Sequence, residues 1–241
     1  MTLVEAIEIR RSRRKYVSMD IDQKAVEKLQ KLIDEYNKIT GFSIGLVLNN
    51  GEAFNKITKT YGMFSGVNHY IGLISDSNDP NSAEKIGYYG ELLILHATTL
   101  GLGTCWVGGA FDKESMPFKL ANNEQIQCAI IIGNTQDTLS FREKLMHGVT
   151  HRKIKSATDM YTSDAPVPDW FESGMQAVTK APSAVNSQPV TFTYIAGKVT
   201  AEVKGAQAVD LGIAKLHFEL GAGGGTWKWG NSTEFVKKYN A

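Results

Sequence analysis

The chain has 241 residues, of which 42% are hydrophobic and 21% charged, and its formal net charge is +1. This length allows a large buried core in one large domain or in two small ones. The near-neutral charge argues against bulk electrostatic capture of nucleic acid or of an anionic membrane, so any anion binding should be local.

The cysteine count and the N-terminus indicate the cellular setting. Cys105 and Cys128 each lie in an apolar stretch, which is typical of reduced core thiols rather than of a disulfide framework. The acidic N-terminal stretch does not resemble a signal peptide, and no apolar run approaches the roughly 20 residues that span a bilayer. We therefore expect a soluble, cytoplasmic protein that binds neither membrane nor nucleic acid.

Hydrophobic spacing predicts the elements of the first half. A short helix should precede residue 10, and a helix over residues 22–37 carries a one-sided apolar stripe. A helix over residues 83–100 is apolar almost all round, which predicts a place at the centre of the fold. Strands are expected over residues 42–48, 69–75 and 126–133, the last being a continuous apolar run typical of a strand buried on both faces.

A change of composition predicts a second structural unit. Residues 134–155 are polar and basic, and residues 163–169 contain two prolines and resemble a linker. We therefore divide the chain into residues 1–162 and residues 163–241. The second unit should contain helices over residues 170–180 and 209–220 and strands over residues 191–196 and 199–203.

The second unit repeats the first in outline. His96 lies ten residues before Trp106, and His217 lies ten residues before Trp227. In both places a helix, a glycine-rich turn and a tryptophan follow one another. This order favours an internal duplication.

Residues 10–16, here called the arginine arm, contain Arg10, Ser12 and Arg14 in an Arg-x-Ser-x-Arg pattern. Guanidinium groups can bind phosphate oxygens bidentately, and a neighbouring hydroxyl can donate as well. Arg13 occupies the variable position of the pattern. Taken alone, the cluster also fits a solvated group of cations that complements a helix dipole.

Residues 181–189, here called the proline–serine loop, read Ala-Pro-Ser-Ala-Val-Asn-Ser-Gln-Pro. A helix should end at the first proline and a strand should begin at the second. The amides of Asn186 and Gln188 offer both donors and acceptors to a ligand. Composition alone also fits an ordinary turn.

Two further segments could contribute to a site. Residues 101–109, Gly-Leu-Gly-Thr-Cys-Trp-Val-Gly-Gly, would let the main chain approach a flat ring closely, although a helix cap followed by a loop is the alternative. They follow a helix and lack the third glycine of the G-x-G-x-x-G pattern, so they are not a dinucleotide-binding loop. The basic residues 150–153 are either an anion contact or a surface charge run.

Together these motifs resemble the signatures of the nitroreductase family of flavin mononucleotide (FMN) enzymes. The resemblance implies an α+β fold with a mixed, mostly antiparallel sheet flanked by helices. In the family, two chains build each flavin site, one giving the arm and the other the loop. Here the first unit keeps only the arm and the second only the loop. This division implies a single-chain pseudo-dimer with one composite FMN site.

The resemblance also implies a role for each residue. Arg10 would contact the flavin ring edge or the phosphate, Ser12 and Arg14 the phosphate and ribityl chain, and a backbone N–H at Gly108 or Gly109 would face N5 of the flavin. Trp106 would border the substrate pocket. The remaining cofactor contacts implied by the family are Arg11, Pro182, Ser183, Asn186, Gln188 and Arg152.

The activity that the resemblance implies is ping-pong reduction of a small aromatic or quinone-like acceptor by NAD(P)H, with no catalytic side chain beyond the flavin. Two alternatives stay open: an FMN-binding protein for flavin storage, sensing or cleavage, and a scaffold without cofactor. The sequence contains no metal-ligand spacing, nucleophile elbow or P-loop. The choice of acceptor and of nicotinamide, and further dimerisation, also stay open.

Overall fold

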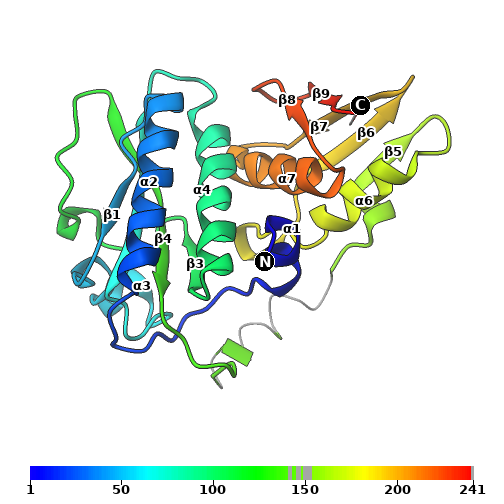
Figure 1. Cartoon of the computed structure of the whole chain (residues 1–241). Coiled ribbons are helices and arrows are strands. Elements are labelled where there is room, and N and C mark those ends of the chain that lie inside the picture. Colours follow the sequence, from blue (N-terminus) through cyan, green and yellow to red (C-terminus); the bar gives the residue numbers. More distant parts are fainter. Residues whose placement is uncertain (141–142, 145–147, 149–153, 240–241) are drawn as a thin grey trace.

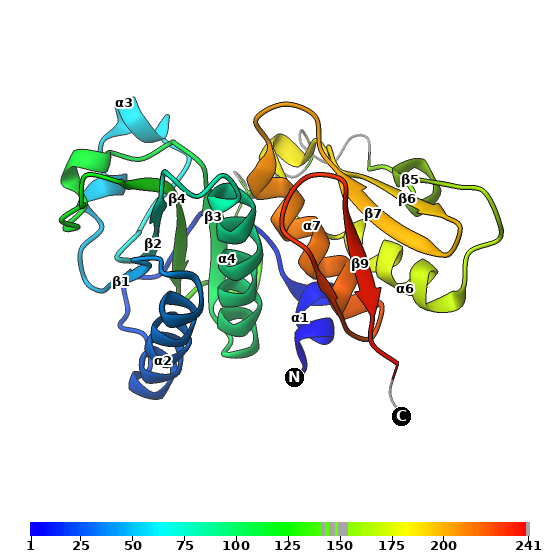
Figure 2. The ribbon, with the colours of Figure 1, turned by 90° about the horizontal axis from the view of Figure 1, so that it is seen from above.

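The computed structural model describes residues 1–140, 143–144, 148 and 154–239 of the chain. It contains two sheets, each flanked by helices, with two long helices between them (Figures 1 and 2). The described helices are α1 (Leu3–Ile9), α2 (Gln23–Thr40), α3 (Ile57–Thr60), α4 (Ser82–Thr99), α6 (Asp169–Val178) and α7 (Ala208–Gly221). Short 3-10 turns are η1 (Glu52–Phe54), η2 (Lys113–Ser115), η3 (Ala157–Met160) and η4 (Ala184–Asn186).

The first sheet is entirely antiparallel and has the order β1-β2-β4-β3. Its strands are β1 (Gly45–Val47), β2 (His69–Asp76), β3 (Gly103–Val107) and β4 (Glu124–Gly133). The predicted strands correspond to β1, β2 and β4. Strand β3 lies inside the glycine-rich segment for which no strand was predicted.

The second sheet has the order β5-β6-β7-β9-β8 and is antiparallel except for the parallel pair β5–β6. Its strands are β5 (Tyr161–Ser163), β6 (Thr191–Ile195), β7 (Lys198–Glu202), β8 (Gly225–Trp227) and β9 (Thr233–Lys237). The unit boundary placed after residue 162 falls within β5. Because β5 pairs with β6, the junction between the two sheets precedes Tyr161.

The two sheets share one connectivity. In the first, a helix (α2) leads into the hairpin β1–β2, then a long helix (α4), then the hairpin β3–β4. In the second, α6 leads into β6–β7, then α7, then β8–β9, and the strand orders β1-β2-β4-β3 and β6-β7-β9-β8 correspond. A duplicated unit would produce this shared order.

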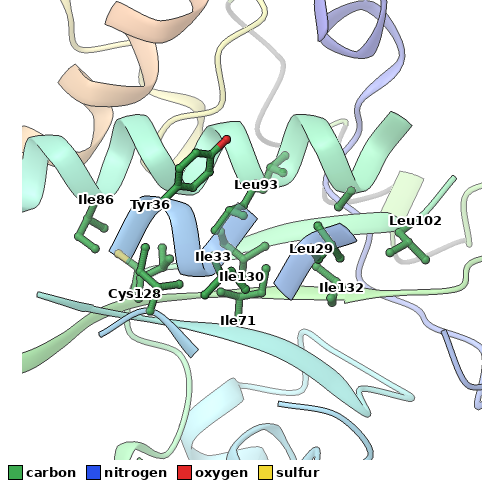
Figure 3. Close-up of a cluster of buried hydrophobic side chains, with 14 of the residues drawn as sticks. Leu29, Ile33, Tyr36, Ile71, Ile86, Leu93, Leu102, Cys128, Ile130 and Ile132 are labelled. Atoms are coloured by element: carbon green, nitrogen blue, oxygen red, sulfur yellow. The ribbon is translucent and has the colours of Figure 1, made fainter. Parts of the chain in front are cut away.

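The first core lies between the sheet and the helices α2 and α4 (Figure 3). Leu29 and Ile33 of α2 and Leu93 of α4 are fully buried there. Alternate residues of β4 point to opposite faces: Ile130 joins this core, while Ile131 joins a second apolar cluster on the other face of the sheet. The continuous apolar run of β4 is therefore buried on both faces, as predicted.

The second unit packs around aromatic rings. Phe171 of α6, Phe192 of β6 and Phe218 of α7 are fully buried, and the rings of Phe192 and Phe218 stack at 5.1 Å between centroids. Trp227 lies against the same cluster, with its indole N–H donating to the Lys215 carbonyl at 2.9 Å. Both cysteines of the chain are buried and unpaired, as predicted.

Helices α4 and α7 cross closely at the centre of the molecule (Figure 2). A Cβ on Gly87 would meet the Val209 carbonyl oxygen at 2.0 Å, and one on Gly212 would meet the Glu84 carbonyl oxygen at 1.8 Å. The two glycines therefore permit a helix contact that any side chain would prevent.

Helix α1 lies where the two units meet. Its Ala6 and Ile7 pack against Leu95 of α4 and Leu216 of α7, with Ala177 of α6 in the same cluster. Burial of α1 at this junction brings the residue that follows it, Arg10, close to the loop that leaves α6. The fold thus sets two distant segments of the chain against each other.

Candidate functional site

The arginine arm leaves α1 and runs along the open edge of strand β3. Ser12 pairs with Thr104 in a parallel bridge, and the Arg13 N–H donates to the Thr104 carbonyl at 2.8 Å. In an extended segment, alternate side chains share one side. Arg10, Ser12 and Arg14 accordingly line the same cavity.

Arg13 faces away from that cavity and anchors the arm. Its Nε donates to Glu143 Oε1 at 3.0 Å, and its NH1 donates to Thr135 Oγ1 at 2.8 Å. Glu143 also accepts the backbone N–H of Arg14 at 2.8 Å and that of Ser140 at 2.7 Å. Burial by itself raises the pKa of this carboxyl, but these N–H donors outweigh burial and bring the pKa to about 2.

The proline–serine loop has an unusual backbone. Val185, Asn186 and Gln188 have φ angles of +48°, +56° and +46°, in the left-handed region that is costly for a β-branched residue such as valine. The Ala184 N–H donates to both carboxylate oxygens of Asp210, at 3.2 and 3.3 Å. Helix α7 thereby holds the loop in this shape.

The arm and the loop line one cavity of about 290 Å³. Arg10, Arg11, Ser12 and Arg14 come from the arm, and Pro182, Ser183 and Asn186 come from the loop. The structure thus brings together seven of the residues that the motifs indicated. The other lining residues are Ile7, Leu139, Glu143, Ile154, Thr179, Lys180, Ala181 and Val185.

Two guanidinium groups in the cavity have no hydrogen-bond acceptor among the residues that the structure describes. The Arg10 side chain is 10% exposed, and its buried Nε has no hydrogen-bond partner there. The Arg14 guanidinium likewise donates to no described residue, although the backbone N–H of Arg14 is bonded. Guanidinium groups without a hydrogen-bond acceptor make the cavity suited to an anion such as a phosphate.

Gln188 lies outside this cavity. It is buried, its Oε1 accepts the Lys155 N–H at 2.8 Å, and its Nε2 donates to the Thr179 carbonyl at 3.1 Å. These bonds occupy the amide within the protein. The Gln188 side chain therefore ties the loop to Lys155 and Thr179 and does not line the cavity.

The glycine-rich segment also lies outside the cavity lining. Trp106 is half-buried, and its indole N–H donates to Glu91 Oε2 at 2.7 Å. Gly108 and Gly109 are exposed, and a Cβ added to either would meet nothing within 4 Å, so open space lies beside this backbone. Arg152, expected as a further phosphate contact, lies outside the described residues.

Sequence reasoning missed three acidic residues that shape the site: Glu143, Glu91 and Asp210. Glu143 sits in the polar segment and showed no local signal, because its role depends on donors from the distant arm. Glu91 lies within an otherwise apolar helix and is fully buried. An acid in an apolar helix is itself a signal, because a buried carboxylate needs a partner.

Asp210, which holds the loop, gives a testable pH dependence. Burial raises the pKa of its carboxyl from 3.8 to about 6, although the Ala184 N–H lowers it in part. The native state therefore keeps a proton up to about pH 6, whereas the unfolded chain loses it near pH 4. Stability should fall as pH rises through this window and then stay level, with a penalty of about 2–3 kcal/mol.

We expect Asp210→Asn to be more stable than the wild type by up to this amount at pH 8, and equally stable near pH 4. The asparagine keeps an acceptor for Ala184 and removes the charge. Chemical denaturation at both pH values measures the difference. A constant difference across pH would show that Asp210 ionises normally in the native protein.

The described part of the chain contains no group of His, Cys, Asp and Glu residues placed to hold a metal ion. Its helices include none with the length and apolarity needed to cross a membrane. The site is a cationic cavity between an arm and a loop, on an α+β fold.

Comparison with solved structures identifies the fold family to which this arrangement of helices and antiparallel sheets belongs. A crystal structure from Thermotoga maritima, described as a "putative nitroreductase", superimposes with a TM-score of 0.65 at 20% identity, covering 98% of this chain and 92% of that chain. A nitroreductase family protein from Clostridium difficile 630 has a TM-score of 0.50 at 19% identity, covering 69% and 100%. The FMN-dependent nitroreductase of C. difficile R20291 has a TM-score of 0.47 at 20% identity, covering 56% and 90%.

The sequence model of one protein family, described as "Putative TM nitroreductase", matches residues 2–222. The chain belongs to this family. No curated protein matches the chain. The predicted family and fold class are thereby confirmed.

Proposed function

We propose that the chain binds one FMN between the arginine arm and the proline–serine loop and acts as an oxidoreductase. The observation that carries this proposal is the shared cavity: Arg10, Arg14 and Asn186, from two units of one chain, line it together. The matching order of elements in the two units further supports a single-chain pseudo-dimer.

The positive charge of the cavity supports this cofactor. Two guanidinium groups lack acceptors among the described residues, and the oxygens of a phosphate would be such acceptors. The volume of about 290 Å³ lies just below the roughly 300–1,000 Å³ typical of small-molecule sites. Open space beside Gly108 and Gly109 would leave room for a flat ring against the backbone.

The residues of the chain would bind and orient the cofactor. Arg14 and Ser12 would hold the phosphate and ribityl chain, with Arg10 and Arg11 adding positive charge. Pro182, Ser183 and Asn186 would contact the ring from the other unit. The backbone at Gly108 and Gly109 would face N5, with Trp106 near the substrate.

The flavin, when bound, supplies hydride and electron transfer, so the protein needs no acid or nucleophile of its own. The reductant that we propose is NAD(P)H, and the acceptor is a small aromatic or quinone-like molecule. Both would use the same ring face in turn, which gives ping-pong kinetics. We propose a soluble, cytoplasmic protein that binds no nucleic acid.

Arg14→Ala and Asn186→Ala test the shared site from its two sides. A charge-assisted hydrogen bond contributes roughly 1.5–3 kcal/mol, so Arg14→Ala should weaken FMN binding about tenfold or more. Asn186→Ala should weaken it less, by a factor of a few, because a neutral contact contributes about 1 kcal/mol.

Quenching of flavin fluorescence measures FMN binding by both variants. The control is Lys144→Ala, because Lys144 is exposed and lies outside the cavity lining. Unchanged binding by Asn186→Ala would remove the second unit from the site.

Steady-state oxidation of NADH and of NADPH with a nitroaromatic or quinone tests the activity. Turnover that depends on bound FMN supports the reductase. FMN binding without turnover favours a flavin store, sensor or flavin-cleaving protein. Absence of FMN binding would leave a scaffold and end the enzymatic proposal.

A further inference from the structure

A buried polar cluster lies directly behind the cavity and joins the two units. Glu91 of α4 is fully buried; its Oε2 accepts the indole N–H of Trp106 at 2.7 Å, and its Oε1 lies 3.0 Å from Nε2 of His217 on α7. The same Oε1 lies 3.8 Å from the buried Nε of Arg10. The cluster therefore connects helix α7 to the arginine that lines the cavity.

The hydrogen-bond pattern fixes how many protons the pair of His217 and Glu91 holds. Nδ1 of His217 lies 3.0 Å from the Ala177 carbonyl, which can only accept, so Nδ1 carries a hydrogen. The contact between Nε2 and Glu91 Oε1 requires one more proton between them. Whether that proton resides on the nitrogen or on the oxygen, the pair carries no net charge.

A neutral pair has a particular consequence for Arg10. The distance of 3.8 Å is too long for a hydrogen bond, but Glu91 Oε1 still gives the desolvated guanidinium an attractive partner. A lone carboxylate at this distance would cancel much of the positive potential that Arg10 gives to the cavity. With His217 beside it, Glu91 can hold Arg10 while leaving that charge available to a ligand.

We propose that Glu91 and His217 are positioning residues, which hold Arg10 in the cavity without neutralising it and so let helix α7 of the second unit support anion binding by the first. This inference rests on the proposed FMN site for its ligand. Its geometry can also be tested without any ligand.

Glu91→Gln isolates the positioning role. A glutamine that keeps its oxygen towards the Trp106 N–H must turn its NH₂ group towards His217 and Arg10. The NH₂ can donate to His217, so the variant should fold, but Arg10 loses the attraction of the Glu91 oxygen. We expect Glu91→Gln to weaken FMN binding about tenfold in the wild-type background. In the Arg10→Ala background, the same substitution should weaken it by less than about twofold.

The chain offers a matched control in a second buried pair between the same helices. Lys215 and Glu84 are both buried, with Nζ 2.5 Å from Oε1, and neither lines the cavity. Glu84→Gln should lose stability, yet the folded protein should bind FMN within about twofold of the wild type. Equal losses of affinity in Glu84→Gln and Glu91→Gln would mean that Glu91 is only structural.

His217→Gln tests the neutralising role. The new amide can still donate to Glu91 but cannot balance its charge, so the carboxylate should oppose the ligand. The groups facing Glu91 are Arg10 from the arm, Trp106 from β3 and His217 from α7. The described charged groups of the cavity are Arg10, Arg11, Arg14, Glu143 and Lys180, and the nearby Asp210 holds the loop.

Because Asp210 is present in both proteins, the readout is the ratio of FMN affinities between His217→Gln and the wild type. We expect this ratio to be about tenfold against the variant. A ratio near unity would overturn the neutralising role.

A ligand-free measurement separates this inference from the proposed function. The Arg10 side-chain Hε, identified in ¹H–¹⁵N spectra by its loss in Arg10→Lys, should exchange slowly in the wild type and in Glu84→Gln and quickly in Glu91→Gln. Slow exchange in Glu91→Gln would overturn the positioning role whether or not FMN binds. If the exchange results hold and the wild type fails to bind FMN, the FMN proposal fails and the positioning of Arg10 stands.

Discussion

Lys215→Met should destabilise the protein by about 3–5 kcal/mol, because it leaves the buried carboxylate of Glu84 without a compensating charge. The ammonium also donates to the Gly230 carbonyl at 2.8 Å and to Thr233 Oγ1 at 2.9 Å, and both acceptors lose this donor. Burial lowers the pKa of Lys215, and Glu84 opposes that shift. In a chain of this length, the melting temperature should fall by roughly 10 °C or more.

The double variant Glu84→Gln/Lys215→Met is the control for this prediction. It removes both charges and should recover much of the lost stability, since a buried pair is often replaceable by neutral residues of similar volume. Thermal unfolding followed by circular dichroism compares the three proteins. An unchanged melting temperature in Lys215→Met would mean that Lys215 is not buried against Glu84.

Gly212→Ala should also cause a large loss of stability, because its Cβ would lie 1.8 Å from the Glu84 carbonyl oxygen and 2.7 Å from the Tyr88 nitrogen. Both atoms belong to the backbone of α4, so the helices must separate. Overpacking typically costs about 1–3 kcal/mol and sometimes more, which exceeds the roughly 1 kcal/mol that alanine adds to helix propensity.

Gly108→Ala provides the comparison, because a Cβ at Gly108 would meet nothing within 4 Å. Denaturation without ligand should show Gly108→Ala close to the wild type and Gly212→Ala well below it. A Gly212→Ala protein as stable as the wild type would contradict the close crossing of α4 and α7.

Long elements could be predicted from the sequence because their burial follows a regular period. Helix α2 carries a one-sided apolar stripe, and β4 carries a continuous apolar run, so each has a local signal. Strands β5 and β8 are three residues long and contain Ser or Gly, and β9 is a short strand at the C-terminal end. Such strands depend on their pairing partners, which a local pattern does not show.

The sequence predicted which motifs line the candidate site, but not the hydrogen bonds that hold them in place. The arm and the loop were recognisable by sequence, and burial of α1 between the units brings them to one cavity. Gln188 matched a motif, but its amide bonds to Lys155, 33 residues away, and to Thr179, and neither contact has a local signal. Glu143 and Glu91 bond to residues on other elements, Arg13 and His217, so only the assembled structure reveals their roles.

The central claim is that one flavin site is shared by the two units of a single chain. Titration of the purified, flavin-free protein with FMN, followed by the visible spectrum and by thermal unfolding, tests it most directly. We predict saturation at one FMN per chain, with a melting temperature that rises with FMN concentration. Saturation at two per chain, or no binding at all, would contradict the account.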